Sequence, residues 1–222
     1  MNFSGKRKRI FLVDDHPLVR EWLTQLINQQ ADLVFCGEAE SAPAALSALC
    51  AGPPDLAIVD ISLKNSSGME LIKNLKKLTP NLPVLVLSMH DESLYAMRVF
   101  QAGARGYINK SETAPKVIAA IRRIMEGKLY LSEQSVELMA NRAISGKELV
   151  SSTPAELLSD RELEIFERLG RGLGTSQIAR EFGTSIKTIQ AHCARIKEKL
   201  HLTSATSLLR EAIRWDETKN PR

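Results

Sequence analysis

The segment Leu56-Ala57-Ile58-Val59-Asp60 is a short apolar run that ends in a carboxylate. Three more apolar runs end in polar side chains: runs 10–13, 84–87 and 107–108 are followed by Asp14-Asp15, Ser88 and Asn109-Lys110. Such runs, set between helix-like stretches, are typical of buried strands in a parallel sheet. Because the carboxyl ends of these strands line the ligand crevice, we expect one sheet edge to carry three carboxylates, a hydroxyl and an ammonium.

These polar groups together suit a metal ion and an anion. The oxygens of Asp14, Asp15 and Asp60 are ligands that a hard cation such as Mg²⁺ accepts. The Ser88 hydroxyl and the Lys110 ammonium suit an anion next to that cation. The pattern therefore predicts a site for a divalent metal and a phosphoryl group.

Strand-like and helix-like stretches alternate over the first 130 residues. The predicted strands are 9–14, 33–37, 56–60, 84–88 and 106–109, and the predicted helices are 16–30, 42–51, 67–79, 92–102 and 114–126. Pro17 suits the first turn of a helix, and Gly103 suits a left-handed cap after one. Five strand–helix units with short connections predict an α/β fold with a doubly wound, five-stranded parallel sheet.

The periodicity weakens after Gly127 and becomes purely helical after Ser159. We predict a first domain over 1–127, a linker over 128–154 with a short helix near 136–143, and a small all-α domain over 155–222. Ser159 and Glu162 have the spacing of a capping box. Helices near 175–181 and 185–200, joined through Gly183, have the pattern of a helix-turn-helix, and a further helix begins near Thr203.

The charge distribution and the cysteine content indicate which partners and which cellular compartment suit the chain. The chain has a net charge of +4, but residues 168–214 hold nine Lys or Arg and three Glu, a local charge of +6. A basic stripe in a helical segment indicates nucleic acid, while a solvated charged face is the alternative. The three widely spaced cysteines form no CxxC pair and suit a reducing cytoplasm, and no stretch has the length of a membrane span.

Four segments, in this order and at these intervals, resemble the NarL/FixJ family of two-component response regulators. They are Val13-Asp14-Asp15-His16-Pro17, Ala57-Ile58-Val59-Asp60-Ile61, Leu87-Ser88-Met89-His90 and Gly103-Ala104-Arg105-Gly106-Tyr107-Ile108-Asn109-Lys110. The first domain resembles a CheY-like receiver, and the second resembles a LuxR-type helix-turn-helix domain. The resemblance covers nearly the whole chain.

The resemblance implies a role for each residue at the sheet edge. Asp60 would accept a phosphoryl group from a sensor histidine kinase, and Lys110 would pair with a phosphoryl oxygen. Ser88 would hydrogen-bond that group, and Tyr107 would then turn inward as a switch. Mg²⁺ would be held by Asp14, Asp15, Asp60 and the backbone carbonyl of Ser62. Lys64 stands where many receivers have Pro, and Ser62 and His90 stand where receivers commonly tune hydrolysis.

The helix predicted over 185–200 has two faces. An apolar stripe is expected to pack inward and consists of Ile186, Ile189, Cys193, Ile196 and Leu200. By the match to the LuxR-type signature, the residues that would face DNA are Lys187, Thr188, Gln190, Ala191, His192 and Arg195, with Lys199 on the flank. Thr175, Ser176 and Gln177 open the preceding helix and are candidates for phosphate contacts. Gln190 and Ala194 replace residues that are often basic in the family, which puts the usual target sequence in doubt.

The leading hypothesis is a cytoplasmic transcription regulator that phosphorylation at Asp60 controls. It would bind double-stranded DNA, form a homodimer when phosphorylated, and need neither a membrane nor catalytic turnover of a substrate. One alternative is a protein-interaction regulator that no longer uses DNA. Another is a phosphohydrolase with an aspartyl-phosphate intermediate, against which Ser62 counts, because it stands where a D-x-D pair needs its second acid.

Overall fold

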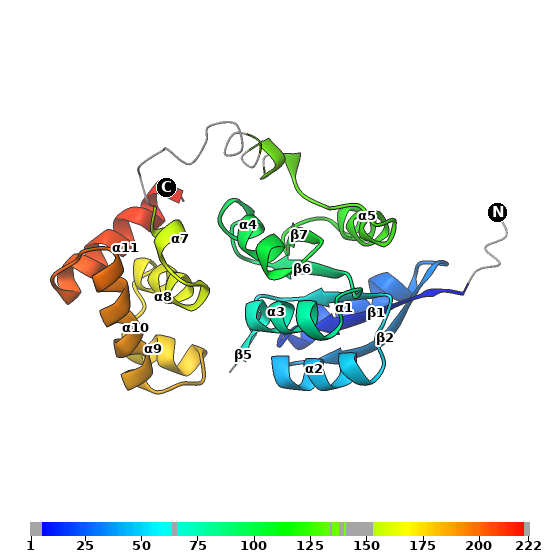
Figure 1. The fold of residues 1–222 in the computed structure, drawn as a ribbon, viewed down its shortest axis with the longest axis horizontal. Helices are drawn as coiled ribbons and strands as arrows, with labels where there is room; N and C mark the ends of the chain where they lie inside the picture. Colours follow the sequence, from blue (N-terminus) through cyan, green and yellow to red (C-terminus); the bar gives the residue numbers. More distant parts are fainter. Residues whose placement is uncertain (1–5, 64–65, 134, 138–139, 141–152, 220–222) are drawn as a thin grey trace. The chain divides into compact units, whose positions relative to one another are not determined.

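The computed structural model describes residues 6–63, 66–133, 135–137, 140 and 153–219 (Figure 1). The chain divides into two compact units, one within residues 1–147 and one within residues 148–222. The first unit alternates strands and helices, and the second is helical throughout its described residues.

The first unit contains a five-stranded parallel sheet with the strand order β2-β1-β3-β6-β7. The strands are β1 Lys8–Val13, β2 Leu33–Ala39, β3 Leu56–Val59, β6 Val84–Ser88 and β7 Gly106–Asn109. This order confirms the predicted doubly wound sheet. It places the reversal of strand order at β1 and β3, where open sheets of this kind bind ligands.

Strand β2 extends two residues beyond the predicted end at residue 37. Its pairing with β1 shifts register between Ile10 and Phe11, so that Phe11 pairs with Gly37 and Val13 with Ala39. The extra residue in β2 lets pairing continue past the irregularity, which a pattern of alternating side chains does not reveal.

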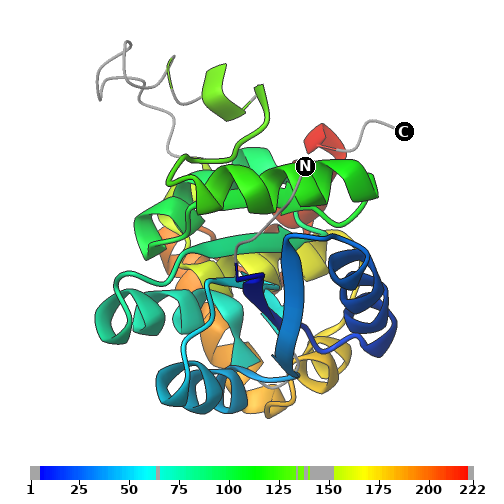
Figure 2. The same cartoon turned by 90° about the vertical axis from the view of Figure 1, so that its right-hand side faces the viewer.

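Five helices cover the sheet. They are α1 Pro17–Asn28, α2 Ala42–Ala51, α3 Gly68–Leu78, α4 Glu92–Ala102 and α5 Ala114–Met125. Proline stands in the first turn of α1, α2 and α5, where its missing N–H would have no partner within the helix. Alternating strand residues such as Ile10 and Leu12 join side chains of α1 and α5 in one apolar core. Figure 2 shows α1 and α5 on one side of the sheet and the other three helices on the opposite side.

A two-stranded hairpin, absent from the predicted elements, follows β3. Its strands are β4 Ser62–Leu63 and β5 Ser66–Ser67, which pair antiparallel. Lys64, which replaces the proline common in receivers, lies outside the described residues. The hairpin leads directly into α3, where the Ser67 side chain accepts a hydrogen bond from the Glu70 N–H and caps the helix.

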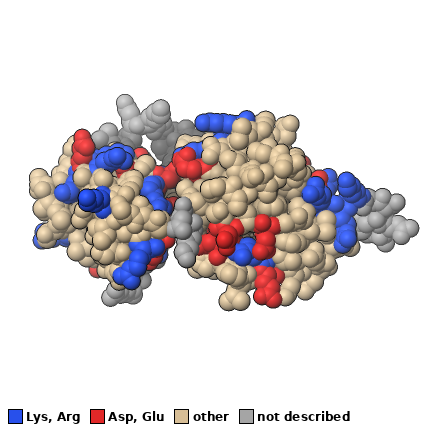
Figure 3. Space-filling view, turned by 90° about the horizontal axis from the view of Figure 1, so that it is seen from below, with Lys and Arg blue, Asp and Glu red and all other residues tan. Residues whose placement is uncertain are grey.

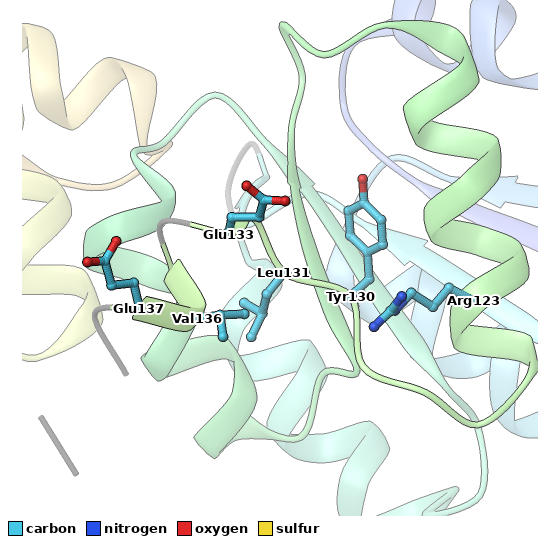
Figure 4. Close-up of a pocket in the computed structure, with 6 residues that line it drawn as sticks. All are labelled: Arg123, Tyr130, Leu131, Glu133, Val136 and Glu137. Carbon is cyan, nitrogen blue, oxygen red and sulfur yellow. The ribbon is translucent and has the colours of Figure 1, made fainter. Parts of the chain in front are cut away.

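The segment after α5 is attached to the edge of the sheet. Tyr107 N–H donates to the Tyr130 carbonyl at 3.1 Å, and Tyr130 N–H donates to the Arg105 carbonyl at 3.1 Å. A pocket of about 470 Å³ lies along this segment and is lined by Arg123, Tyr130, Leu131, Glu133, Val136 and Glu137 (Figure 4). The predicted helix near 136–143 falls largely outside the described residues, although residues 135–137 are helical.

The second unit consists of α7 Pro154–Leu157, α8 Asp160–Gly170, α9 Thr175–Glu181, α10 Ile186–Lys199 and α11 Ala205–Lys219. The capping box at the start of α8 is present, since Ser159 and Glu162 each bond the other's backbone N–H. Phe166, Ile178, Ile189 and Ile196 are buried and form the centre of the unit. The turn between α9 and α10 contains Gly183 with φ +58°, a left-handed conformation that glycine adopts at little cost.

Candidate functional site

Two buried carboxylates meet where β1 and β3 end. Asp14 and Asp60 directly follow these strands, and each is 3% exposed. The Asp60 N–H donates to the Val13 carbonyl at 2.8 Å, which holds the two strand ends together. Asp15 and His16 complete a group whose ligand atoms all lie within 4.8 Å of one another, so that these four residues can hold a metal ion.

Lys110 bridges the two carboxylates. Its Nζ lies 2.6 Å from Asp14 Oδ2 and 2.7 Å from Asp60 Oδ2, and its side chain is 7% exposed. The Lys110 N–H donates to the Ser88 carbonyl at 2.9 Å, which fixes where the lysine leaves the end of β7. The two carboxylates therefore already pair with a cation, and a metal ion bound here would compete with the Lys110 ammonium for their oxygens.

Burial sets the protonation of this pair. Burial raises the pKa of the Asp60 carboxyl above its ordinary value, although the Lys110 ammonium opposes the change. Burial alone would lower the pKa of Lys110, but the Asp60 and Asp14 carboxylates raise it above its ordinary value. The lysine therefore stays charged beside the carboxylates.

Ser88 is the last residue of β6 and Tyr107 lies within the neighbouring strand β7, and both are fully buried. The Tyr107 hydroxyl donates to the His90 carbonyl at 2.8 Å, and burial raises the pKa of that hydroxyl. The sequence interpretation had Tyr107 turning inward after Ser88 engages a phosphoryl group. The ring is inward already in this structure, because the His90 carbonyl satisfies its hydroxyl group.

Ser62 connects the Asp60 loop to His90. The Ser62 N–H donates to Asp60 Oδ1 at 3.2 Å, and Ser62 Oγ lies 2.7 Å from His90 Nε2. The structure thus joins the two positions at which, by the resemblance, receivers commonly tune hydrolysis. The metal-binding role of the Ser62 carbonyl stays a prediction.

His16 is the member of the cluster that the sequence interpretation missed. Its Nδ1 lies 3.1 Å from Asp14 Oδ1 and 3.0 Å from Asp15 Oδ1. The available signal was its place directly after two aspartates and before Pro17, at the N-cap of α1.

The exposed face of α10 carries most of the residues that were predicted to contact DNA. The exposed ones are Lys187, Thr188, Gln190, Ala191, Arg195 and Lys199. Ile189 and Ile196 are fully buried on the other face, as predicted, and Cys193 and Leu200 are half-buried. The prediction that Ile186 packs inward was wrong, because this residue opens the helix and is 45% exposed. Figure 3 shows Lys and Arg side chains at several places on the surface of the second unit.

Two of the predicted DNA contacts have partners within the unit, and a third is half-buried. Lys199 Nζ lies 2.7 Å from Glu162 Oε2, a carboxylate of α8. His192 is half-buried, and burial lowers the pKa of its imidazole. Gln177 Oε1 accepts the Gly174 N–H at 2.8 Å and so caps α9, while Thr175 and Ser176 stand beside it in the first helical turn.

The carboxylate site and the helix-turn-helix define the class of protein as a signalling receiver joined to a DNA-binding domain. Residues 10–122 match the family described as the response regulator receiver domain, and residues 156–212 match that of the bacterial regulatory proteins of the luxR family. The oxygen regulatory protein NreC of Staphylococcus epidermidis is 31% identical over 93% of this chain and 97% of its own length. The chain belongs to the NarL/FixJ family of response regulators and is a DNA-binding transcription regulator.

Solved structures share this fold. A two-component response regulator of the LuxR family from Aurantimonas sp. SI85-9A1 is 30% identical, with a TM-score of 0.58 over 63% of this chain and 99% of that chain. RcsB from Salmonella enterica serovar Typhimurium, bound to promoter P1flhDC in the presence of phosphomimetic BeF3-, is 23% identical. The match covers 93% of this chain and 98% of the RcsB chain, with a TM-score of 0.63. In the described part of the chain, no helix is both long and apolar enough to cross a membrane.

Proposed function

We propose that a sensor histidine kinase phosphorylates Asp60 and thereby controls DNA binding by this regulator. The observation that carries the proposal is the convergence of Asp14, Asp60 and Lys110, with Lys110 Nζ within 2.7 Å of both carboxylates. In the proposed transfer, an Asp60 oxygen attacks the phosphorus of a phosphohistidine, the phosphorus–nitrogen bond breaks, and the imidazole leaves with its electron pair. This is a regulatory modification of the chain itself, without turnover of a separate substrate.

The residues around Asp60 supply charge and orientation. Asp14, Asp15, Asp60 and the Ser62 carbonyl would hold Mg²⁺, whose charge offsets that of the phosphoryl oxygens. The fit rests on the donor set and on Asp15 Oδ1, which is buried and accepts no hydrogen bond from the described residues. Lys110 would move its ammonium from the Asp60 carboxylate to a phosphoryl oxygen. Ser88 would donate its hydroxyl proton to another oxygen, and Tyr107 would report this change through the His90 carbonyl.

DNA binding is proposed for the exposed face of α10. Lys187, Thr188, Gln190, Ala191 and Arg195 would enter the major groove, with His192 and Lys199 at its rim and Thr175, Ser176 and Gln177 near a phosphate. Gln190 can pair with adenine and Arg195 with guanine. A homodimer formed on phosphorylation would read two half-sites about one helical turn apart. RcsB was solved bound to a promoter in the presence of BeF3-, which supports DNA binding by analogy.

We further propose the domain limits 1–127 and 155–222, joined by a linker over 128–154, and a location in the cytoplasm. The described cysteines are free, which agrees with a reducing compartment. The first residues of the proposed linker are attached to the receiver unit, because the Tyr130 backbone is hydrogen-bonded to the edge of the sheet.

The test compares the full chain with an Asp60→Asn variant, both with Mg²⁺ and with or without beryllofluoride. Light scattering should show the wild type alone changing from monomer to dimer. Intact-mass spectrometry after incubation with a phosphohistidine donor should show one added phosphoryl group on the wild type and none on the variant. Phosphorylation of the variant would overturn Asp60 as the acceptor. An unchanged wild-type mass in solution would overturn phosphorylation-driven dimerisation.

A further inference from the structure

The Asp14 carboxylate divides the site into two sides. Its Oδ2 faces Lys110 at 2.6 Å, and its Oδ1 faces His16 Nδ1 at 3.1 Å. The His16 N–H also donates to Asp14 Oδ1 at 2.9 Å. The Asp14 oxygen that does not contact Lys110 therefore contacts the imidazole of His16.

Asp15 completes this second side. Its Oδ1 lies 3.0 Å from His16 Nδ1, yet it accepts no hydrogen bond of suitable geometry from any described residue and is buried. A buried carboxylate oxygen without a donor costs free energy unless a cation satisfies it. A protonated His16 ring forms an ion pair with this oxygen. In the neutral ring whose Nδ1 carries no proton, both Nδ1 and Asp15 Oδ1 offer a lone pair to an ion.

The spacing of the four side chains suits a single ion. The ligand atoms of Asp14, Asp15, His16 and Asp60 all lie within 4.8 Å of one another. Ligands on opposite sides of one ion stand about 4.0–4.4 Å apart, because each bond is about 2.0–2.2 Å long, so the group would draw in by less than about 1 Å on binding. Oxygen ligands suit Mg²⁺, whereas an imidazole nitrogen suits first-row transition metals. The identity of the fourth ligand can therefore set which cation the site prefers.

We propose that His16 Nδ1 is a metal ligand beside Asp14, Asp15 and Asp60, and that it shifts the preference of the site from Mg²⁺ toward transition-metal cations. This inference rests on the metal site of the proposed function and adds a ligand and a selectivity to it. His16 is suited to the role because its side chain is 62% exposed, so that it can turn toward an ion without repacking a core.

The test uses Mn²⁺ as the probe and His16→Asn as the variant, both in the full chain. Asn is a good N-cap for α1, and its amide oxygen is a ligand that Mg²⁺ accepts. Pulsed EPR of the wild type with Mn²⁺ should show a directly bound nitrogen, and its signal should change when histidine is labelled with ¹⁵N. The variant should lose this nitrogen coupling. Its Mn²⁺ affinity should fall about tenfold, while its Mg²⁺ affinity changes less than about twofold.

Two controls separate the possible failures. His201→Gln changes an exposed histidine of the second unit and should keep the coupling. Asp15→Asn should lower the affinity of the site for both Mn²⁺ and Mg²⁺. If Mn²⁺ binds in an Asp15-dependent manner without a nitrogen coupling, His16 is not a ligand, and the metal site of the proposed function still stands. If Asp15→Asn leaves the binding of both ions unchanged, the metal site itself is wrong and the inference falls with it.

Discussion

Gly68 packs directly against the backbone of Asp60, so closely that a Cβ at this position would overlap the Asp60 carbonyl oxygen. The Gly68 N–H also donates to the Ile61 carbonyl at 2.9 Å. The start of α3 therefore supports the loop that carries the proposed phosphoacceptor, and only glycine leaves room for this approach.

We expect Gly68→Ala to displace the Asp60 loop. The added methyl group must push backbone atoms apart, and overpacking of this kind costs about 1–3 kcal/mol in the free energy of unfolding. Urea unfolding should show the loss, and phosphorylation with a small-molecule donor should slow markedly. Gly52→Ala is the matched control, because a Cβ there meets nothing within 4 Å. Equal behaviour of the two variants would show that Gly68 does not position the loop.

Lys110 should act as an internal competitor of the metal ion. Lys110→Met leaves Asp14 and Asp60 buried without their ammonium, and breaking a buried ion pair costs about 3–5 kcal/mol. In EDTA the variant should therefore unfold at lower urea, and Mg²⁺ should restore its stability more than it stabilises the wild type. Lys116→Met, at an exposed pair with Glu112, is the control and should leave the urea midpoint nearly unchanged. A Mg²⁺ response equal to that of the wild type would contradict this competition.

The order of strands and helices could be predicted because each strand is an unbroken apolar run with a polar residue at its end. Leu56 to Val59 followed by Asp60 is the clearest example, and the predicted bounds of β3 differ from the observed ones by one residue. The β4–β5 hairpin could not be predicted, because its strands are two residues long and carry no alternation. The exposure of Ile186 was missed since its spacing fits the apolar stripe, while its place in the first turn of α10 leaves it partly uncovered.

The sequence was enough to predict which residues gather at the ends of the strands. It was not enough to predict which atoms those residues contact. The sequence indicated that Asp14, Asp60 and Lys110 share one edge, since parallel strands end on the same side. It did not indicate that Tyr107 is already inward, because that depends on the His90 carbonyl, which a loop brings within 2.8 Å. The hydrogen bond between Ser62 and His90 depends on loop geometry in the same way.

His192 should make the second unit less stable in acid. Burial lowers the pKa of its imidazole below the 6.5 of a free histidine, with Arg195 acting in the same direction and Glu162 against it. The unfolded chain therefore binds this proton more readily, so stability that is present above pH 6.5 is lost as the pH falls. His192→Gln should flatten the decline between about pH 7 and pH 5.

Trp215 provides the readout for the second unit, because its ring packs against Phe166 with centroids 5.4 Å apart. Its fluorescence can be followed during urea unfolding in a Trp22→Phe background, which removes the tryptophan of the first unit. If the stability of His192→Gln falls with decreasing pH as steeply as that of the wild type, His192 is not the group responsible for the loss of stability in acid.

Lys187 and Gln190 should affect DNA binding in different ways, although both are exposed on α10. If Lys187 pairs with a phosphate, Lys187→Ala should weaken binding to all sequences alike and reduce the slope of log K against log salt by about 1. If Gln190 pairs with a base, Gln190→Ala should leave that slope unchanged and relax the preference at one position, at a cost of about 1–3 kcal/mol on the best site. Salt titrations on a selected site and a scrambled duplex measure both effects. Lys128→Ala, an exposed lysine of the first unit paired with Glu126, is the control and should change neither. Loss of sequence preference in Lys187→Ala, or of salt dependence in Gln190→Ala, would reverse the two assignments.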